Sequence, residues 1–168
     1  DRLCNDAIVE NPGARQEEIK IKGDTTEAAL TRAAMEVGFD PAELEKETPR
    51  IDEVPFDSKW RFMMTLHKFS EKQNIVYIKG APEELLKEHV GYIFQREKGR
   101  SGKEKASHKK LTDKDRSKLL RKVDELSSEG LRVLALGYRK VDSKEKDIKK
   151  VSSVKGEFVF VAFVGIRD

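Results

Sequence analysis

A lysine and a glycine at the end of an apolar segment form the clearest candidate binding feature of this sequence. Residues 75–78 are β-branched or aromatic and predict a strand, and Lys79-Gly80-Ala81-Pro82-Glu83 follows directly and opens a helix. Lys79 brings a positive charge to the strand end, Gly80 lets a ligand approach the backbone, and Pro82 suits the first helical position. Because the N–H groups of a helix start attract anions, the junction predicts a phosphate-bearing ligand. Many such junctions bind nothing, so the prediction depends on the surrounding segments.

Three further segments, together with this junction, resemble the nucleotide-binding (N) domain of P-type cation-transporting ATPases. They follow one another in the family's order and are residues 23–30 (GDTTEAAL), residues 55–58 (PFDS) with Arg61 and Met63, and residues 130–136 (GLRVLAL). Residues 3–6 (LCND) resemble the entry to that domain, and residues 164–168 (VGIRD) resemble the return to the next one. The resemblance covers nearly the whole chain and is closer to the calcium and sodium/potassium branch than to the heavy-metal branch.

The resemblance implies how the adenine of a nucleotide is held. Phe56 matches the phenylalanine that stacks on adenine, although an aromatic residue at a strand exit is, from the sequence alone, more typical of a core. Glu27 matches the acidic residue near the adenine amino group, and Asp24 belongs to the same motif. Asp24 and Glu27 also have the spacing of a helix capping box, and the two roles are compatible. Lys79 matches the lysine of the deep adenine pocket. The resemblance therefore implies that its charge faces the adenine ring and the ribose more than the phosphates.

Other positions match family residues that contact the rest of the nucleotide. Arg132 matches the residue that contacts phosphate, where a planar guanidinium can bind two oxygens. Arg61 occupies the position where the family usually has a lysine or another polar residue that contacts the nucleotide. It matches that position in charge but not in residue type. Met63 and Met64 are adjacent on a predicted strand and point to opposite faces, which places one of them in the core.

The pattern of elements predicts an α+β domain. Strands are expected at residues 17–22, 51–56, 61–69, 74–79, 131–138 and 157–166, and helices after Asp24, Asp40, Pro82 and Thr112. The last strand is nearly all apolar and is expected to be central and covered on both faces, whereas residues 95–105 are expected to form a solvated loop. The order favours an antiparallel sheet with helices packed against it, and the resemblance implies a twisted antiparallel sheet flanked by helical hairpins.

Composition narrows the class of protein. With 168 residues the chain fits one domain, assigned here to residues 1–168. A net charge of +3 is too small to indicate nucleic acid or membrane binding, and no apolar run approaches the roughly 18 residues of a membrane span. One cysteine excludes an internal disulfide, and the spacing of the three histidines predicts no metal site. A monomer without direct membrane contact is expected.

The family resemblance implies the function. The chain is interpreted as a domain excised from a larger membrane pump, which binds ATP through adenine and presents the γ-phosphate to an aspartate of a separate domain. The intact parent is then an ATP hydrolase and cation translocase that uses Mg-ATP, whereas this chain lacks the family's Asp-Lys-Thr-Gly-Thr motif and is expected to be inactive alone. Its partners are ATP and the phosphorylation and actuator domains of the pump. Its location is the cytoplasmic side of a cell-membrane protein.

Two other functions remain open. A basic nucleic-acid-binding module would use the tract from Arg96 to Lys110 and bind DNA or RNA in a salt-dependent way, although Glu97 and Glu104 interrupt the tract and aromatic residues do not alternate with its charges. In a non-nucleotide adaptor domain, the same motifs would serve only as caps and turns. The second alternative predicts that replacing Phe56 or Lys79 changes stability or nothing, without affecting ATP binding.

Overall fold

The computed structural model describes residues 3–12, 14, 18–98 and 104–167. The strands and helices along the chain are β1 (Ile8–Val9), β2 (Ile21–Lys22), α1 (Thr25–Glu36), α2 (Pro41–Glu47), β3 (Arg50–Asp57), β4 (Phe62–Lys68), β5 (Gln73–Gly80), α3 (Pro82–Glu84), the π-helical turn η2 (Leu85–His89), β6 (Val90–Lys98), β7 (Glu104–Lys110), α4 (Asp113–Ser128), β8 (Arg132–Asp142), α5 (Ile148–Ser152) and β9 (Phe158–Ile166).

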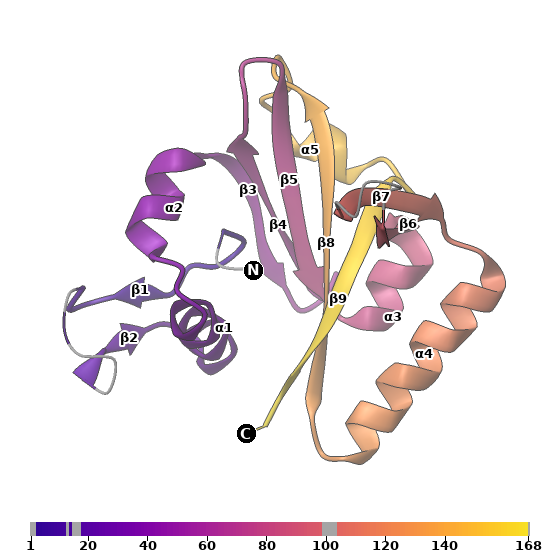
Figure 1. Ribbon diagram of the computed structural model, residues 1–168, viewed down its shortest axis with the longest axis horizontal. Helices are drawn as coiled ribbons and strands as arrows, with labels where there is room; N and C mark the ends of the chain where they lie inside the picture. Colours follow the sequence, from indigo (N-terminus) through magenta and orange to yellow (C-terminus); the bar gives the residue numbers. More distant parts are fainter. Residues whose placement is uncertain (1–2, 13, 15–17, 99–103, 168) are drawn as a thin grey trace.

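Seven of these strands form one twisted sheet, in the order β3-β4-β5-β8-β9-β6-β7. Each neighbouring pair is antiparallel except β6 and β9, which run parallel. Figure 1 shows α1, α2 and the small β1–β2 sheet on one side of the large sheet, and α3 and α4 on the other. The predicted α+β class, with a mostly antiparallel sheet and packed helices, is therefore confirmed.

The hydrophobic core lies between the large sheet and the helices that follow β5. Its members are fully or nearly fully buried and include Met64, Leu66, Val76, Ile78, Leu85, Leu86, Ile148 and Phe158. Met63 on the opposite face of β4 is buried as well, so both faces of this strand are covered. The prediction that one of the two methionines lies in the core is confirmed by Met64. Met63 packs beneath the N-terminal segment, where its carbonyl accepts a hydrogen bond from the Cys4 thiol at 3.6 Å.

Helix ends follow the predicted signals. Thr112 and Asp115 form a complete capping box at the start of α4, and Gly130 ends this helix with a positive φ of 78°. At α1 only half of the predicted box exists, because Asp24 caps the N–H of Thr26 at 2.8 Å while the side chain of Glu27 points elsewhere. The expected capping-box role of Glu27 is therefore wrong.

Two expectations about the second half of the sheet also fail. The expected loop at residues 95–105 is wrong for the part that is described, because residues 95–98 belong to β6 and residues 104–105 to β7, and these strands pair with each other. Residues 99–103 lie outside the described residues. Polar strands are stable here because the backbone of β6 pairs with β9 and β7, and an edge strand need not bury its side chains. β9 lies inside the sheet between β8 and β6, as expected of a central strand, but only Phe158, Val159 and Phe160 are buried. Val161 is 45% exposed, so the expected cover along the whole strand is wrong.

The first predicted strand shortens to Ile21–Lys22, and its start at residue 17 lies outside the described residues. Among the helices of the described residues, none has both the length and the apolar character needed to cross a membrane.

Candidate nucleotide pocket

A cavity of about 460 Å³ opens between the start of α1 and one end of the large sheet. The N-terminal segment, α1, β3, β4, β5 and β8 all contribute to its walls, although these elements are far apart in the sequence (Figure 1). The residues lining it are Asp6, Asp24, Thr26, Glu27, Pro55, Phe56, Met63, Lys79, Gly80, Arg132 and Leu134. Seven of the eight predicted site residues are thus brought together, with Arg61 as the exception.

A buried ion pair forms the inner wall of this pocket. The Lys79 ammonium on β5 lies 2.7 Å from Oε1 of Glu27 on α1, and the two side chains are only 7% and 16% exposed. The register of β4 and β5 sets Met63 directly beside Lys79. Burying a charge is costly unless it is paired, so each of the two groups holds the other in place. This contact also explains why Glu27 does not complete the capping box.

Phe56 forms another wall of the pocket, and its ring is exposed to solvent, unlike the buried Lys79–Glu27 pair. The side chain lies near the end of β3, lines the pocket and is 63% exposed to solvent. The interpretation of Phe56 as a core residue is therefore excluded. An exposed aromatic ring at the mouth of a pocket is a ready surface for stacking a flat ligand.

Charged and hydroxyl groups surround the remaining side of the pocket. Nη1 of Arg132, at the start of β8, donates a hydrogen bond to Oγ1 of Thr26 at 3.1 Å. Thr26 in turn gives its backbone N–H to the capping carboxylate of Asp24. These contacts tie the start of α1 to β8 and leave a guanidinium at the rim, where an anionic group can reach it.

Arg61 lies outside the pocket wall. It occupies the turn between β3 and β4 with a positive φ of 58°, and its guanidinium pairs with Glu83 at 3.2 Å. Its backbone also explains Gly80, because a Cβ on residue 80 would lie 2.4 Å from the Arg61 carbonyl oxygen and 2.7 Å from Cα of Phe62. The glycine is therefore required by the close approach of the chain itself, in addition to lining the pocket.

Four pocket residues were not predicted from the sequence. All four lie inside the recognised motifs, and alternation along β8 from Arg132 would also have found Leu134. For Asp6 the motif indicated only the entry to the domain and no role in binding. Asp6 reaches the pocket because the N-terminal segment folds back over the sheet.

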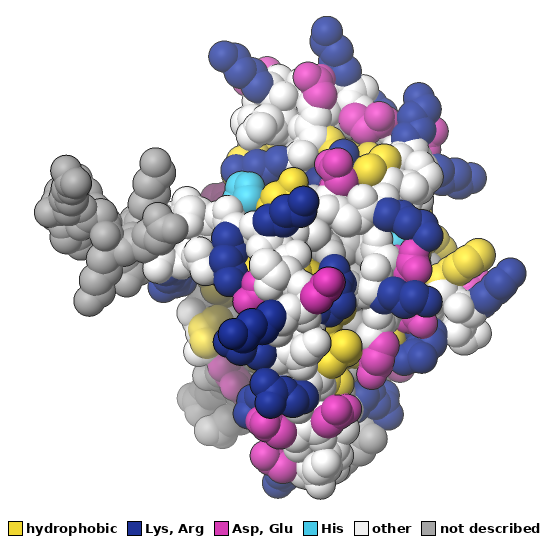
Figure 2. Space-filling model, turned by 90° about the vertical axis from the view of Figure 1, so that its right-hand side faces the viewer, with side chains coloured by type: hydrophobic (Ala, Val, Ile, Leu, Met, Phe, Trp, Pro, Cys, Tyr) yellow, Lys and Arg dark blue, Asp and Glu magenta, His cyan; other side chains and the backbone are white. Residues whose placement is uncertain are grey.

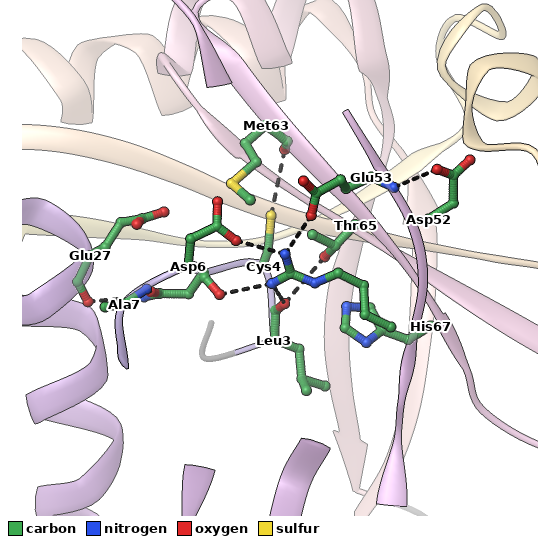
Figure 3. Close-up of polar contacts among 12 residues, drawn as sticks. Leu3, Cys4, Asp6, Ala7, Glu27, Asp52, Glu53, Met63, Thr65 and His67 are labelled. Atoms are coloured by element: carbon green, nitrogen blue, oxygen red, sulfur yellow. Dashed lines mark hydrogen bonds and ion pairs between the residues drawn. The ribbon is translucent and has the colours of Figure 1, made fainter. Parts of the chain in front are cut away.

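Arg50 holds that segment in place. Figure 3 shows the carboxylates of Asp6 and Glu53 and the backbone carbonyl of Leu3 beside one guanidinium, which belongs to Arg50. Nη1 lies 2.6 Å from both carboxylates, and Nη2 donates to the carbonyls of Leu3 and Asn5. The two carboxylates raise the pKa of Arg50 against the opposing effect of burial. Asn5 extends the network by donating a hydrogen bond to the Glu27 carbonyl at 2.9 Å.

The neighbouring thiol and imidazole are not reactive groups. Cys4 is fully buried, and burial raises the pKa of its thiol to about 11, which keeps it protonated. His67 is buried, with Nδ1 2.8 Å from the Thr48 carbonyl, and burial lowers its pKa. No cluster of three or more potential metal ligands occurs in the described part of the chain.

Comparison with known proteins identifies the domain type. Residues 2–168 match the family described as P-type ATPase, cytoplasmic domain N. The chain belongs to this family. Among its relatives are a cation-transporting ATPase of Synechocystis sp., 29% identical over 99% of this chain, and calcium-transporting ATPases of Listeria monocytogenes and Bacillus cereus, 32% and 31% identical over 88% and 99%. The matched regions span only 15–16% of these relatives' own lengths. The N-domain recognition made from the sequence motifs is thereby confirmed.

Proposed function

We propose that this N domain, a single unit over residues 1–168, binds ATP through its adenine and presents the γ-phosphate to an aspartate on a separate domain of a cation pump. The observation that carries the proposal is one cavity that combines an exposed aromatic ring, Phe56, with the buried Lys79–Glu27 pair. The names of the relatives, which are cation- and calcium-transporting ATPases, support ATP as the ligand.

Each group in the cavity has a role suited to a part of ATP. The Phe56 ring stacks on the purine, and the Glu27 oxygen that does not bind Lys79 accepts a hydrogen bond from the adenine amino group. Arg132 at the rim binds a phosphate oxygen. Arg61 is paired with Glu83 and does not line the cavity, so it has no direct contact with the nucleotide in this proposal.

The domain acts by positioning. Holding the adenine leaves the triphosphate projecting, and closure toward the phosphorylation domain brings the γ-phosphate to the acceptor aspartate. This chain's own residues supply no Mg²⁺ cluster among those described, so Mg²⁺ would arrive with the phosphates as Mg-ATP. In the intact pump the domain would lie on the cytoplasmic side of the membrane and work with the phosphorylation and actuator domains.

An ATP titration followed by NMR tests the proposal. Millimolar ATP is expected to shift the backbone signals of Phe56 and Lys79, with an affinity that changes little when Mg²⁺ is added, because base and ribose contacts dominate. ADP is expected to compete and GTP to compete poorly, since guanine offers a carbonyl where adenine offers an amino group. Absence of shifts at either residue at millimolar ATP would overturn the proposal and favour the adaptor alternative.

A variant of Phe56 tests the stacking contact. Phe56→Ala is expected to weaken ATP binding about tenfold or more, because stacking on a base is worth about 1–3 kcal/mol. Phe69→Ala is the matched control: Phe69 is also an exposed phenylalanine, but it lies just past the far end of β4, about 20 Å along the strand from Met63. Equal ATP affinity of the two variants would contradict the stacking role.

A further inference from the structure

A second cavity, of about 520 Å³, lies on the other side of the β3–β4 turn. It is bounded by the turn residues Lys59 and Trp60, by η2 and by the end of α5, and it shares no lining residue with the nucleotide pocket. Nothing in the proposed ATP-binding role uses it. Its volume lies within the range of small-molecule sites.

The inner wall of this cavity carries a polar group without a partner. His89 is only 7% exposed, and its Nδ1 has no hydrogen-bond partner among the described residues. Its ring is instead packed edge-on against Phe62, with ring centroids 4.6 Å apart. Burial lowers the pKa of His89, so that the imidazole is neutral near pH 7. Buried polar atoms are nearly always paired, so this nitrogen can take a hydrogen-bond partner that reaches it through the cavity.

The backbone around His89 is also unusual. Residues 85–89 form a π-helical turn, a rare conformation that is frequent at functional sites. This turn ends at His89 and delivers the ring to the cavity, while Leu85 and Leu86 of the same turn enter the core. The rare backbone conformation and the unpaired nitrogen therefore occur at one place.

The outer wall is an exposed aromatic ring. Trp60 is 52% exposed, and the ammonium of Lys59 lies 4.7 Å from the centroid of its ring, which restrains the indole. Phe62 and Val54 continue the apolar surface inward. A flat apolar ring fits between such walls.

The charges that line the cavity balance. Lys59 and Lys155 face Glu84 and Glu88, and Lys155 already forms an ion pair with Glu88. A ligand with a net charge would therefore gain no electrostatic advantage and would lose its hydration. The cavity favours a neutral molecule.

We propose that this cavity is a second ligand site, which binds a neutral planar aromatic molecule carrying a hydroxyl group. The aromatic ring packs against Trp60, and the hydroxyl hydrogen-bonds to the imidazole of His89. A hydroxyl both donates and accepts, so it suits either tautomer of the histidine. Because Nδ1 is shielded in the ligand-free chain, the ring turns toward the entering ligand as the bond forms.

Trp60 supplies the test, because it is the only tryptophan of the chain and its indole N–H gives a single NMR signal. The isotopically labelled protein is titrated separately with phenol, toluene and benzoate as probes. Phenol is expected to shift the Trp60 indole signal and the ring nitrogen signals of His89 in a saturable way. Toluene, which lacks the hydroxyl, should bind about five- to tenfold more weakly, and benzoate should not saturate the site.

The outcomes separate this site from the nucleotide pocket. The amide signal of Thr26, which lines only the nucleotide pocket, should stay in place during the phenol titration. His89→Phe should abolish the preference for phenol over toluene. If that variant does not fold, the test is whether phenol shifts the His89 ring nitrogen signals of the unaltered chain in a saturable way. Shifts that grow linearly without saturation, equal binding of toluene, or movement of Thr26 in place of Trp60 would each overturn the proposal, whether or not ATP binds.

Discussion

At the scale of single residues, the Lys79–Glu27 pair decides whether the candidate pocket keeps its shape. The two groups come from β5 and α1, and their contact at 2.7 Å is largely shielded from water. A charge left alone in such a place is far more costly than either charge in the pair. The pair therefore links the binding site to the stability of the domain.

Replacing one partner of the Lys79–Glu27 pair is expected to destabilise the domain more than replacing both. Lys79→Met leaves the Glu27 carboxylate buried without its counter-charge and should lower the free energy of unfolding by about 2–4 kcal/mol. The double variant Glu27→Gln, Lys79→Met should recover most of this loss. Urea unfolding at pH 7 measures both values. A double variant as unstable as the sum of the two single variants would show that the pair does not act as a unit.

At the scale of elements, the N-terminal segment is the least expected part of the site. It carries Asp6 into the pocket and Asn5 onto the carbonyl of Glu27, yet only two short strands follow it before α1. Arg50 of β3 makes several of the polar contacts that hold it, since its guanidinium binds the Asp6 carboxylate and the carbonyls of Leu3 and Asn5.

Arg50→Ala is expected to release this segment from the sheet. The loss of several charge-assisted hydrogen bonds should lower stability by about 2–4 kcal/mol and speed amide hydrogen exchange at Ala7, whose N–H is bonded to Asn5. Arg121→Ala, a change at an exposed position of α4, is the control and should alter neither quantity. Unchanged exchange at Ala7 in the Arg50 variant would mean that the segment is held by other contacts.

At the scale of the whole molecule, surface charge and buried histidines set the response to conditions. On the face shown in Figure 2, lysine and arginine side chains are interspersed with aspartate and glutamate. The face therefore has no broad region of one sign, and strong nucleic-acid binding is not favoured there. Inside, His67 and His89 both have pKa values lowered by burial.

These two histidines predict an acid-sensitive stability. Below about pH 6.5 the unfolded chain takes up protons on both imidazoles while the folded chain resists them, so the free energy of unfolding should fall as the pH drops from 6.5 toward the lowered native pKa values. Urea unfolding at pH 7.5, 6.5 and 5.5 measures the effect. His108→Gln, at an exposed position, should leave the pH dependence intact. A constant stability across this range would contradict the assignment of buried neutral histidines.

Most of the elements and the domain family could be predicted from patterns of consecutive residues. Alternating and apolar runs located β3, β4, β5 and α4, because local periodicity and capping residues are written in consecutive positions. Ordered motifs identified the family and singled out seven residues that line one pocket. For polar strands such as β6 and β7 the local pattern failed, because their stability comes from backbone pairing with strands distant in the chain.

The contacts among the candidate residues could not be predicted in this way and emerge from the folded chain. It paired Glu27 with Lys79, turned Arg61 toward Glu83, exposed Phe56 and brought Asp6 to the pocket. It also created the second cavity around His89, which no motif marks. Such relations depend on the register of strands and the packing of helices, which join residues 22 to 106 positions apart, and no local rule of sequence encodes them.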